Sequence, residues 1–280
     1  MCRLFGFRSV VRSRAHRSLI AAHNALSVQA REHRDGWGMA YYQDGDAYLL
    51  KREAGAAECE SFRRASERLA THTLIAHVRR ATVGDLSPLN VHPFRHGRWV
   101  AAHNGTLHGF DRVGPLLARD TPSLLEERVL GSTDSEAWFH WLLGRFVDAG
   151  IDPSGVGTIH AGHLLDTLAA AQHALLALVA EAGAPPPIMN FLLTNGDVFV
   201  AQRWGRDLHF STQKRRCPDA GTCPWSDRIC LEAARPEGRL NHLLVASEQI
   251  GADDVWEEVP EHSLLLVGSD WRLQARPLEA

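Results

Sequence analysis

The sequence predicts a fold of mixed α and β type, and three observations support this. Short β-rich runs alternate with segments in which apolar residues recur at spacings of three and four. The last third of the chain is dominated by strand patterns. Neither an internal repeat nor a low-complexity segment interrupts this order. We therefore expect a single domain over residues 1–280.

The first 110 residues contain five of the predicted strands. Runs typical of strands, bounded by glycine, aspartate or histidine, lie at residues 2–7, 37–42, 47–51, 73–78 and 99–103. Between them, residues 15–31 and 58–70 have apolar residues at helical spacing with few breakers, and we expect a helix in each.

Two longer helices are expected in the middle of the chain. Residues 132–134 (STD), with Glu136 close behind, form a helix-capping pattern, so a helix should begin here and end at Gly150. A further helix is expected at residues 162–182.

The rest of the chain is expected to form strands. Residues 195–196 (Asn-Gly) separate two β-rich runs and predict the turn of a hairpin. Further strands are expected at about 207–211, 242–247, 263–268 and 271–276. Residues 213–240 are rich in Arg, Pro, Gly and Cys and predict an irregular surface insertion.

The composition excludes several classes of protein. Of 280 residues, 45% are apolar and 22% are charged, which is typical of a globular protein. The net charge is −3 and basic residues are scattered, so neither a nucleic acid nor a membrane is an expected partner. The apolar stretch 164–180 contains Asp166, Gln172 and His173 and indicates a buried or amphipathic helix rather than a membrane span. Five unevenly spaced cysteines favour a reducing cytoplasm over a disulfide framework.

Cys2, directly after the initiator methionine, is a candidate nucleophile. Removal of Met1 would leave a thiol and a free α-amine on one residue. Because such an amine has an unperturbed pKa of about 7.7 to 8.0, part of it can accept the thiol proton near neutral pH. The position alone is also compatible with a small apolar residue that opens the first strand.

Paired arginines end the strand predicted at 73–78. A guanidinium at this place can hold a carboxylate by two parallel hydrogen bonds. Because side chains alternate along a strand, Arg79 and Arg80 should lie on opposite faces, and only one of them can face a site. The alternative for either is a solvated strand end.

Two further segments contain candidate polar groups. Asn104 and Gly105 supply a side-chain amide and an unobstructed backbone N–H, which are the components of an oxyanion hole, although Asn-Gly is also the sequence of a type I′ turn. Asp134 could hold a substrate ammonium group or only cap the helix that begins there.

The order of these motifs resembles the glutaminase domain of class II glutamine amidotransferases, which are N-terminal-nucleophile hydrolases. The matching motifs are Cys2, RDGWG at 34–38, HVRRAT at 77–82, HPF at 92–94, HNGTL at 103–107 and STDSE at 132–136. The resemblance is close over residues 2–140. Later, TNGDVFVA and HLLVASE are similar to the stand-alone bacterial subgroup, which has no fused synthase domain.

The resemblance implies a fold and a catalytic apparatus. The fold is a four-layer αββα sandwich, with two antiparallel sheets between layers of helices. Cys2 would attack the γ-carboxamide carbon of glutamine while its α-amine relays the proton. Asn104 and the backbone of Gly105 would stabilise the oxyanion.

The resemblance also implies a substrate pocket. Arg79 would bind the substrate α-carboxylate, with Thr82 assisting at the same strand end. Asp134 would hold the α-ammonium group, and Gly36 would shape the pocket. Neither a metal nor another cofactor is implied.

Three functions stay open. No Walker A or G-x-G-x-x-G sequence is present, so the ammonia would pass to a separate synthase. Alternatively the enzyme hydrolyses a γ-glutamyl conjugate, because the subgroup is similar to the γ-glutamyl hydrolase of ergothioneine biosynthesis. A non-enzymatic regulatory or binding module should lack at least one of the motif residues, and all are present. The oligomeric state is not predicted.

Metal sites are the last alternative. His92, His96, His103 and His108 lie in one short segment, but their spacing matches no ligand pattern such as H-E-x-x-H. A structural zinc site in the insertion would need Cys217, Cys223 and Cys230 with His209 or His242. Their gaps are irregular and no C-x-x-C is present, so free cysteines are expected there.

Overall fold

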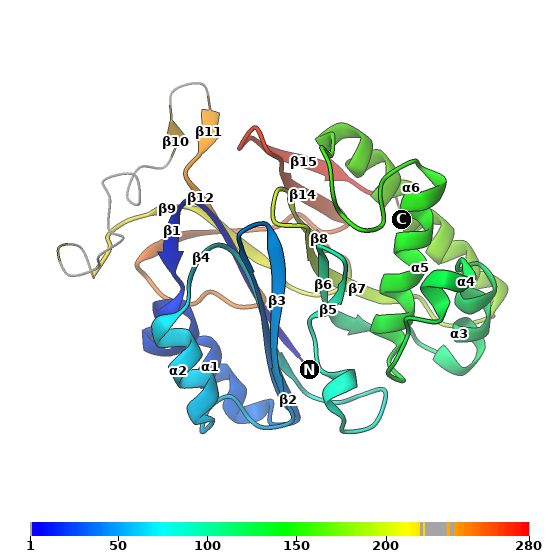
Figure 1. Ribbon diagram of the computed structural model, residues 1–280, viewed down its shortest axis with the longest axis horizontal. Coiled ribbons are helices and arrows are strands. Elements are labelled where there is room, and N and C mark those ends of the chain that lie inside the picture. Colours follow the sequence, from blue (N-terminus) through cyan, green and yellow to red (C-terminus); the bar gives the residue numbers. More distant parts are fainter. Residues whose placement is uncertain (1, 219–220, 222–233, 236–237, 280) are drawn as a thin grey trace.

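The computed structural model describes residues 2–218, 221, 234–235 and 238–279. Two antiparallel sheets lie face to face, and helices cover the outer face of each sheet (Figure 1). Three separate apolar cores lie between the successive layers. The predicted αββα sandwich is therefore confirmed.

Sheet 1 has seven strands. It contains the strand that follows Cys2 and the strand that ends at Arg79. Its spatial order is β13 (Asp254–Glu258), β9 (His209–Lys214), β12 (His242–Ala246), β1 (Arg3–Arg14), β4 (Ala70–Arg79), β2 (Gly36–Gln43) and β3 (Asp46–Arg52). β1 pairs with β4 in antiparallel register, with Arg3 opposite Val78. The start of β1 and the end of β4 therefore lie side by side.

Sheet 2 has six strands and contains Asn104. Its order is β15 (Leu273–Pro277), β14 (Ser263–Val267), β8 (Phe199–Arg203), β7 (Ile188–Thr194), β6 (Trp99–Thr106) and β5 (Phe94–His96). The predicted hairpin turn at 195–196 joins β7 to β8, with Gly196 at a positive φ of 94°. The sequence patterns did not indicate β5 or β13.

Short helices cover the outer face of sheet 1. They are a π-helix η1 (Arg17–Ala21), α1 (Leu26–Gln29), a 3₁₀-helix η2 (Ala30–Glu32) and α2 (Glu60–Arg68). The helix expected at 58–70 is confirmed, but the continuous helix expected at 15–31 is wrong. Ala22 and Ala25 are extended, and between them the Asn24 side chain donates to Glu248 and to the carbonyl of Gln249. This polar side chain is satisfied by tertiary contacts that a straight helix would not allow.

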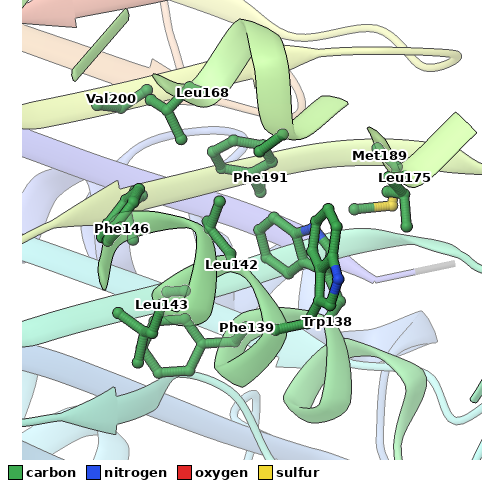
Figure 2. Packing of buried hydrophobic residues seen from close by; sticks show 14 of the residues in the cluster. Trp138, Phe139, Leu142, Leu143, Phe146, Leu168, Leu175, Met189, Phe191 and Val200 are labelled. Carbon is green, nitrogen blue, oxygen red and sulfur yellow. The ribbon is translucent and has the colours of Figure 1, made fainter. Parts of the chain in front are cut away.

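Three longer helices and the short α4 cover the outer face of sheet 2. They are α3 (Phe110–Arg119), α4 (Ser123–Glu126), α5 (Asp134–Asp148) and α6 (Ala161–Glu181). Figure 2 shows Trp138 and Leu142 of α5 beside Phe191 of β7, and Phe139 beside Leu143, in the largest core of the described residues. The helices expected from 132–134 to Gly150 and at 162–182 are confirmed. α3 was not expected, because Gly114 and Pro115 lie inside it.

α6 is the one helix of the described residues that is long and apolar enough to cross a membrane. Its buried leucines, among them Leu164, Leu168 and Leu175, belong to the core over sheet 2. As the sequence predicts, it is a core helix.

The insertion expected at 213–240 begins within β9, which continues to Lys214. Its other described elements are β10 (Ala234–Arg235) and β11 (Arg239–Leu240), which pair with each other. Residues 219–220, 222–233 and 236–237 lie outside the described residues. The assignment of residues 1–280 to one domain stays a prediction.

Candidate active site

Cys2 lies directly before β1, beside the residue that follows β4. Its Sγ is 3.4 Å from both the backbone nitrogen and the carbonyl oxygen of Arg80. Burial raises the pKa of the Cys2 thiol, while the Arg80 backbone and the charge of Arg79 lower it and the charge of Asp134 raises it. The thiol thus lies close enough to Arg79 and Asp134 to be affected by their charges, and these are the two residues that the sequence analysis expects to bind the substrate.

Arg79 is the last residue of β4 and is 2% exposed, whereas Arg80 is exposed. The expected placement on opposite faces is confirmed. Ile75 on the same strand face belongs to the core between the sheets, so Arg79, four residues further along, faces that same gap.

The Arg79 guanidinium holds the loop that follows β4. It donates to the carbonyl oxygens of Val83 (2.9 Å), Gly84 (3.2 Å) and Asp85 (3.1 Å). A guanidinium has five N–H donors, so these three contacts leave capacity for a further acceptor. Gly36 lies opposite Arg79 on β2, and a Cβ at Gly36 would come 2.8 Å from Val91 Cγ2. Because Gly36 also has a φ of +150°, a larger residue there would be strained as well as crowded by Val91.

Thr82 lies in the same loop with an exposed side chain. Among the described residues, no hydrogen bond links this side chain to the other predicted site residues. Thr82 is therefore close to Arg79 along the chain, but the structure shows no contact of its side chain with the other predicted site residues.

Asn104 and Gly105 lie inside β6, opposite Asn190 and Met189 of β7. The alternative of a type I′ turn is therefore wrong. Asn104 is 4% exposed, and it shares a strand face with Ala102 of the core between the sheets. A Cβ at position 105 would lie 1.8 Å from the carbonyl oxygen of Ile188, so only glycine fits there.

Asp134 is the first residue of α5, and Thr133 is the N-cap, with its hydroxyl accepting from the Glu136 backbone at 3.2 Å. The buried Asp134 carboxylate accepts from the backbone N–H of Leu107 at 2.8 Å, just after β6. Asp134 thus ties the start of α5 to the end of the strand that carries Asn104, and the helix cap is a separate residue.

Two buried histidines, His77 and His92, lie near Arg79. His77 lies two residues before Arg79 on the same strand face, and its ring centre is 4.3 Å from that of His92. Burial lowers the pKa of His77 to about 3 and that of His92 well below its ordinary value. Both rings therefore stay neutral near pH 7 and add no cation beside Arg79.

His103 is a structural residue on the other face of β6. Its Nδ1 lies 2.8 Å from the Ser135 hydroxyl and its Nε2 lies 2.9 Å from the carbonyl oxygen of Ile188. In the described part of the chain, no group of three histidine, cysteine or acidic residues could hold a metal ion. Cys217 is a free thiol, while Cys223 and Cys230 lie outside the described residues.

The sequence patterns missed two residues of this site. Ser247 and Glu248 follow β12, and their side chains bond to Asn104 and to Arg3 respectively. The motif HLLVASE, which ends in these residues, was the available signal, but nothing in it indicates which side chains they contact.

Two cavities open elsewhere. One of about 100 Å³ lies over the outer face of sheet 1, beside Phe5 and Phe7, and one of about 380 Å³ is lined by Arg8, Tyr42 and Trp271. Neither is lined by Cys2, Arg79, Asn104 or Asp134, so the contacts of these four residues, and not the size of a cavity, mark the candidate site.

Comparisons with known proteins show the family and the fold. The family model described as "Glutamine amidotransferases class-II" matches residues 1–273. The probable glutamine amidotransferase DUG3 of Saccharomyces cerevisiae is 27% identical over 254 residues, which are 83% of this chain and 69% of that protein. The gamma-glutamyl-hercynylcysteine sulfoxide hydrolase of Mycobacterium tuberculosis is 25% identical over 239 residues, which are 83% and 75% of the two chains. A glutamine aminotransferase class-II domain protein from Silicibacter pomeroyi has the same fold, with a TM-score of 0.67, 16% identity and full coverage of both chains.

Proposed function

Because the chain belongs to the class II glutamine amidotransferases, we propose that Cys2, once Met1 is removed, hydrolyses the γ-carboxamide of glutamine to glutamate and ammonia. The observation that carries this proposal is the placement of the Cys2 thiol at the end of β4, within electrostatic reach of Arg79 and Asp134. One cation and one anion beside a nucleophile match the α-carboxylate and α-ammonium groups of a glutamyl substrate.

The proposed reaction has two steps. The α-amine of Cys2 takes the thiol proton, the thiolate attacks the carbonyl carbon of the γ-carboxamide, and the proton passes to the departing ammonia, so that a thioester remains. Water then cleaves the thioester and releases glutamate. In both steps the Asn104 amide and the Gly105 N–H donate to the oxyanion.

The substrate is held at its α-amino acid end. Arg79 binds the α-carboxylate, with Thr82 at the same loop, and Asp134 binds the α-ammonium group. Gly36 keeps the space beside Arg79 open. The ammonia passes to a separate synthase, and the protein works in the cytoplasm, where its thiols stay reduced.

A second candidate is hydrolysis of a γ-glutamyl conjugate, the activity named for the mycobacterial relative. Arg206 favours it. This residue lies in the crossover from β8 to β9, where its carbonyl accepts from Asn190, the residue opposite Asn104. Burial lowers the pKa of Arg206, and the nearby Cys2 opposes that shift. Among the described residues its buried Nε has no hydrogen-bond partner, so it is suited to an anionic group on the departing amine.

Release of ammonia or of the departing amine from a panel of four compounds tests both candidates, because cleavage of N-acetylglutamine would give N-acetylglutamate and no free glutamate. Glutamine, γ-glutamyl methylamide and γ-glutamylglycine should all be cleaved, because each has a free α-amino acid end. N-acetylglutamine should fail, since Asp134 would be left without its partner. Faster cleavage of γ-glutamylglycine than of the methylamide would favour the conjugate hydrolase. Absence of release from all four, or efficient cleavage of N-acetylglutamine, would refute the proposed substrate.

The two arginines at the end of β4 provide a matched pair of variants. Arg79→Lys keeps the charge but loses the planar fork, and should raise KM for glutamine by about tenfold or more. Arg80→Lys should leave KM unchanged, because the Arg80 side chain is exposed and only its backbone contacts Cys2. Steady-state kinetics of both variants check this, and equal damage from the two would show that the carboxylate lies elsewhere.

A further inference from the structure

Ser247 joins the strand of the nucleophile to the strand of the oxyanion hole. Its Oγ accepts a hydrogen bond from the backbone N–H of Leu4 at 2.9 Å and another from Asn104 Nδ2 at 3.3 Å. Leu4 is two residues from Cys2 on β1, whereas Asn104 lies on β6 in the other sheet. We infer that Ser247 is a positioning residue, which aims the Asn104 amide at the oxyanion and keeps it in register with Cys2.

The contacts of Ser247 make it a rigid support. Its backbone N–H donates to the carbonyl oxygen of Leu4 at 3.0 Å, so backbone and side chain are both tied to the same residue of β1. Ser247 is 7% exposed and Asn104 is 4% exposed, so bulk water cannot easily replace the hydroxyl. One N–H of the Asn104 amide is used by Ser247, and the other remains to donate to the substrate.

The next residue supports the nucleophile itself. Glu248 accepts from Arg3 Nε at 2.6 Å, and Arg3 Nη1 donates to the carbonyl oxygen of Cys2 at 3.2 Å. Glu248 is held in turn by Asn24 Nδ2 at 3.1 Å. Ser247 therefore contacts the proposed oxyanion donor Asn104 directly, and Glu248 is linked to the proposed nucleophile Cys2 through Arg3.

A mutation tests the role of Ser247, which rests on the proposed glutaminase function. In Ser247→Ala the Asn104 amide loses its support, and kcat for glutamine should fall by about tenfold while KM changes less than twofold. Ser263→Ala is the matched control, because Ser263 is also buried (3% exposed) and its hydroxyl donates a hydrogen bond to the carbonyl oxygen of Pro260. We expect Tm to fall by a similar amount in Ser247→Ala and in Ser263→Ala, and kcat to stay unchanged in Ser263→Ala.

A double mutant shows whether Ser247 acts through Asn104. If it does, adding Ser247→Ala to Asn104→Ala should cause almost no further loss of kcat, so the two effects are not additive. Additive losses, or full kcat in Ser247→Ala, would overturn the inference while leaving the glutaminase function intact.

A measurement independent of activity completes the test. The side-chain amide NMR signals of Asn104 should shift in Ser247→Ala and stay in place in Ser263→Ala. Unchanged Asn104 signals in Ser247→Ala would overturn the inference even if no substrate is cleaved. Conversely, the Asn104 signals could shift in Ser247→Ala while the wild-type protein releases no glutamate. That result would refute the proposed function and retain the contact between Ser247 and Asn104.

Discussion

Replacing Cys2 by alanine is expected to abolish glutamate release while the protein stays folded. The thiol is the proposed nucleophile, and no other group at the site can form the thioester. Cys2 lies before β1 and its side chain is small, so the loss of its sulfur removes little packing. The release assay and a thermal melt check both parts, and substantial turnover in the alanine variant would end the proposal.

Cys2→Ser should be severely impaired as well, because a hydroxyl is far less ionisable than a thiol with a pKa of about 8.5. The glutamine-like electrophile 6-diazo-5-oxo-norleucine should label Cys2 and spare Cys59, a free thiol away from the site. Mass spectrometry of the labelled peptides decides this, and the intact mass shows whether Met1 has been removed, which the mechanism requires.

Asn104→Ala is expected to lower kcat by about 100-fold or more, with a smaller change in KM. The reason is that the amide's hydrogen bond strengthens only as negative charge develops on the substrate oxygen. A change confined to KM would instead assign Asn104 to ground-state binding.

Asn195→Ala is a suitable control for this effect. Asn195 is equally buried, but it lies in the turn between β7 and β8 and its amide donates to the carbonyl of Gly155. Its loss should reduce the free energy of unfolding and leave kcat unchanged. Circular dichroism melts of both variants separate the loss of stability from the loss of catalysis.

Parts of the fold were readable from local patterns. Thr133 and Glu136 marked the start of α5 correctly, because a helix cap depends on residues only a few positions apart. The break near Asn24 was not readable, since it depends on contacts with residues 248–250, far along the chain. Gly114 and Pro115 similarly obscured α3, whose packing against α5 outweighs two poor helix formers.

The candidate site shows the same division. Alternation along β4 was enough to separate Arg79 from Arg80, since the period of a strand is a local property. Whether the pair at Asn104 forms a turn or a strand was not decided by its own residues, because both conformations accept Asn-Gly. The neighbouring β7 decided it by pairing with β6.

The sequence by itself was enough to recognise the family, because six ordered motifs are written in the chain, and that resemblance implied the layered fold. Only the tertiary structure decided how the residues of these motifs meet. The antiparallel register of β1 and β4 brings Cys2 to Arg80, and the stacking of two sheets brings Ser247 within a hydrogen bond of Asn104. These contacts join residues 78 and 143 positions apart. No local pattern encodes such a contact, because a hydrogen bond between distant residues forms only after backbone pairing and core packing have set the distance between them.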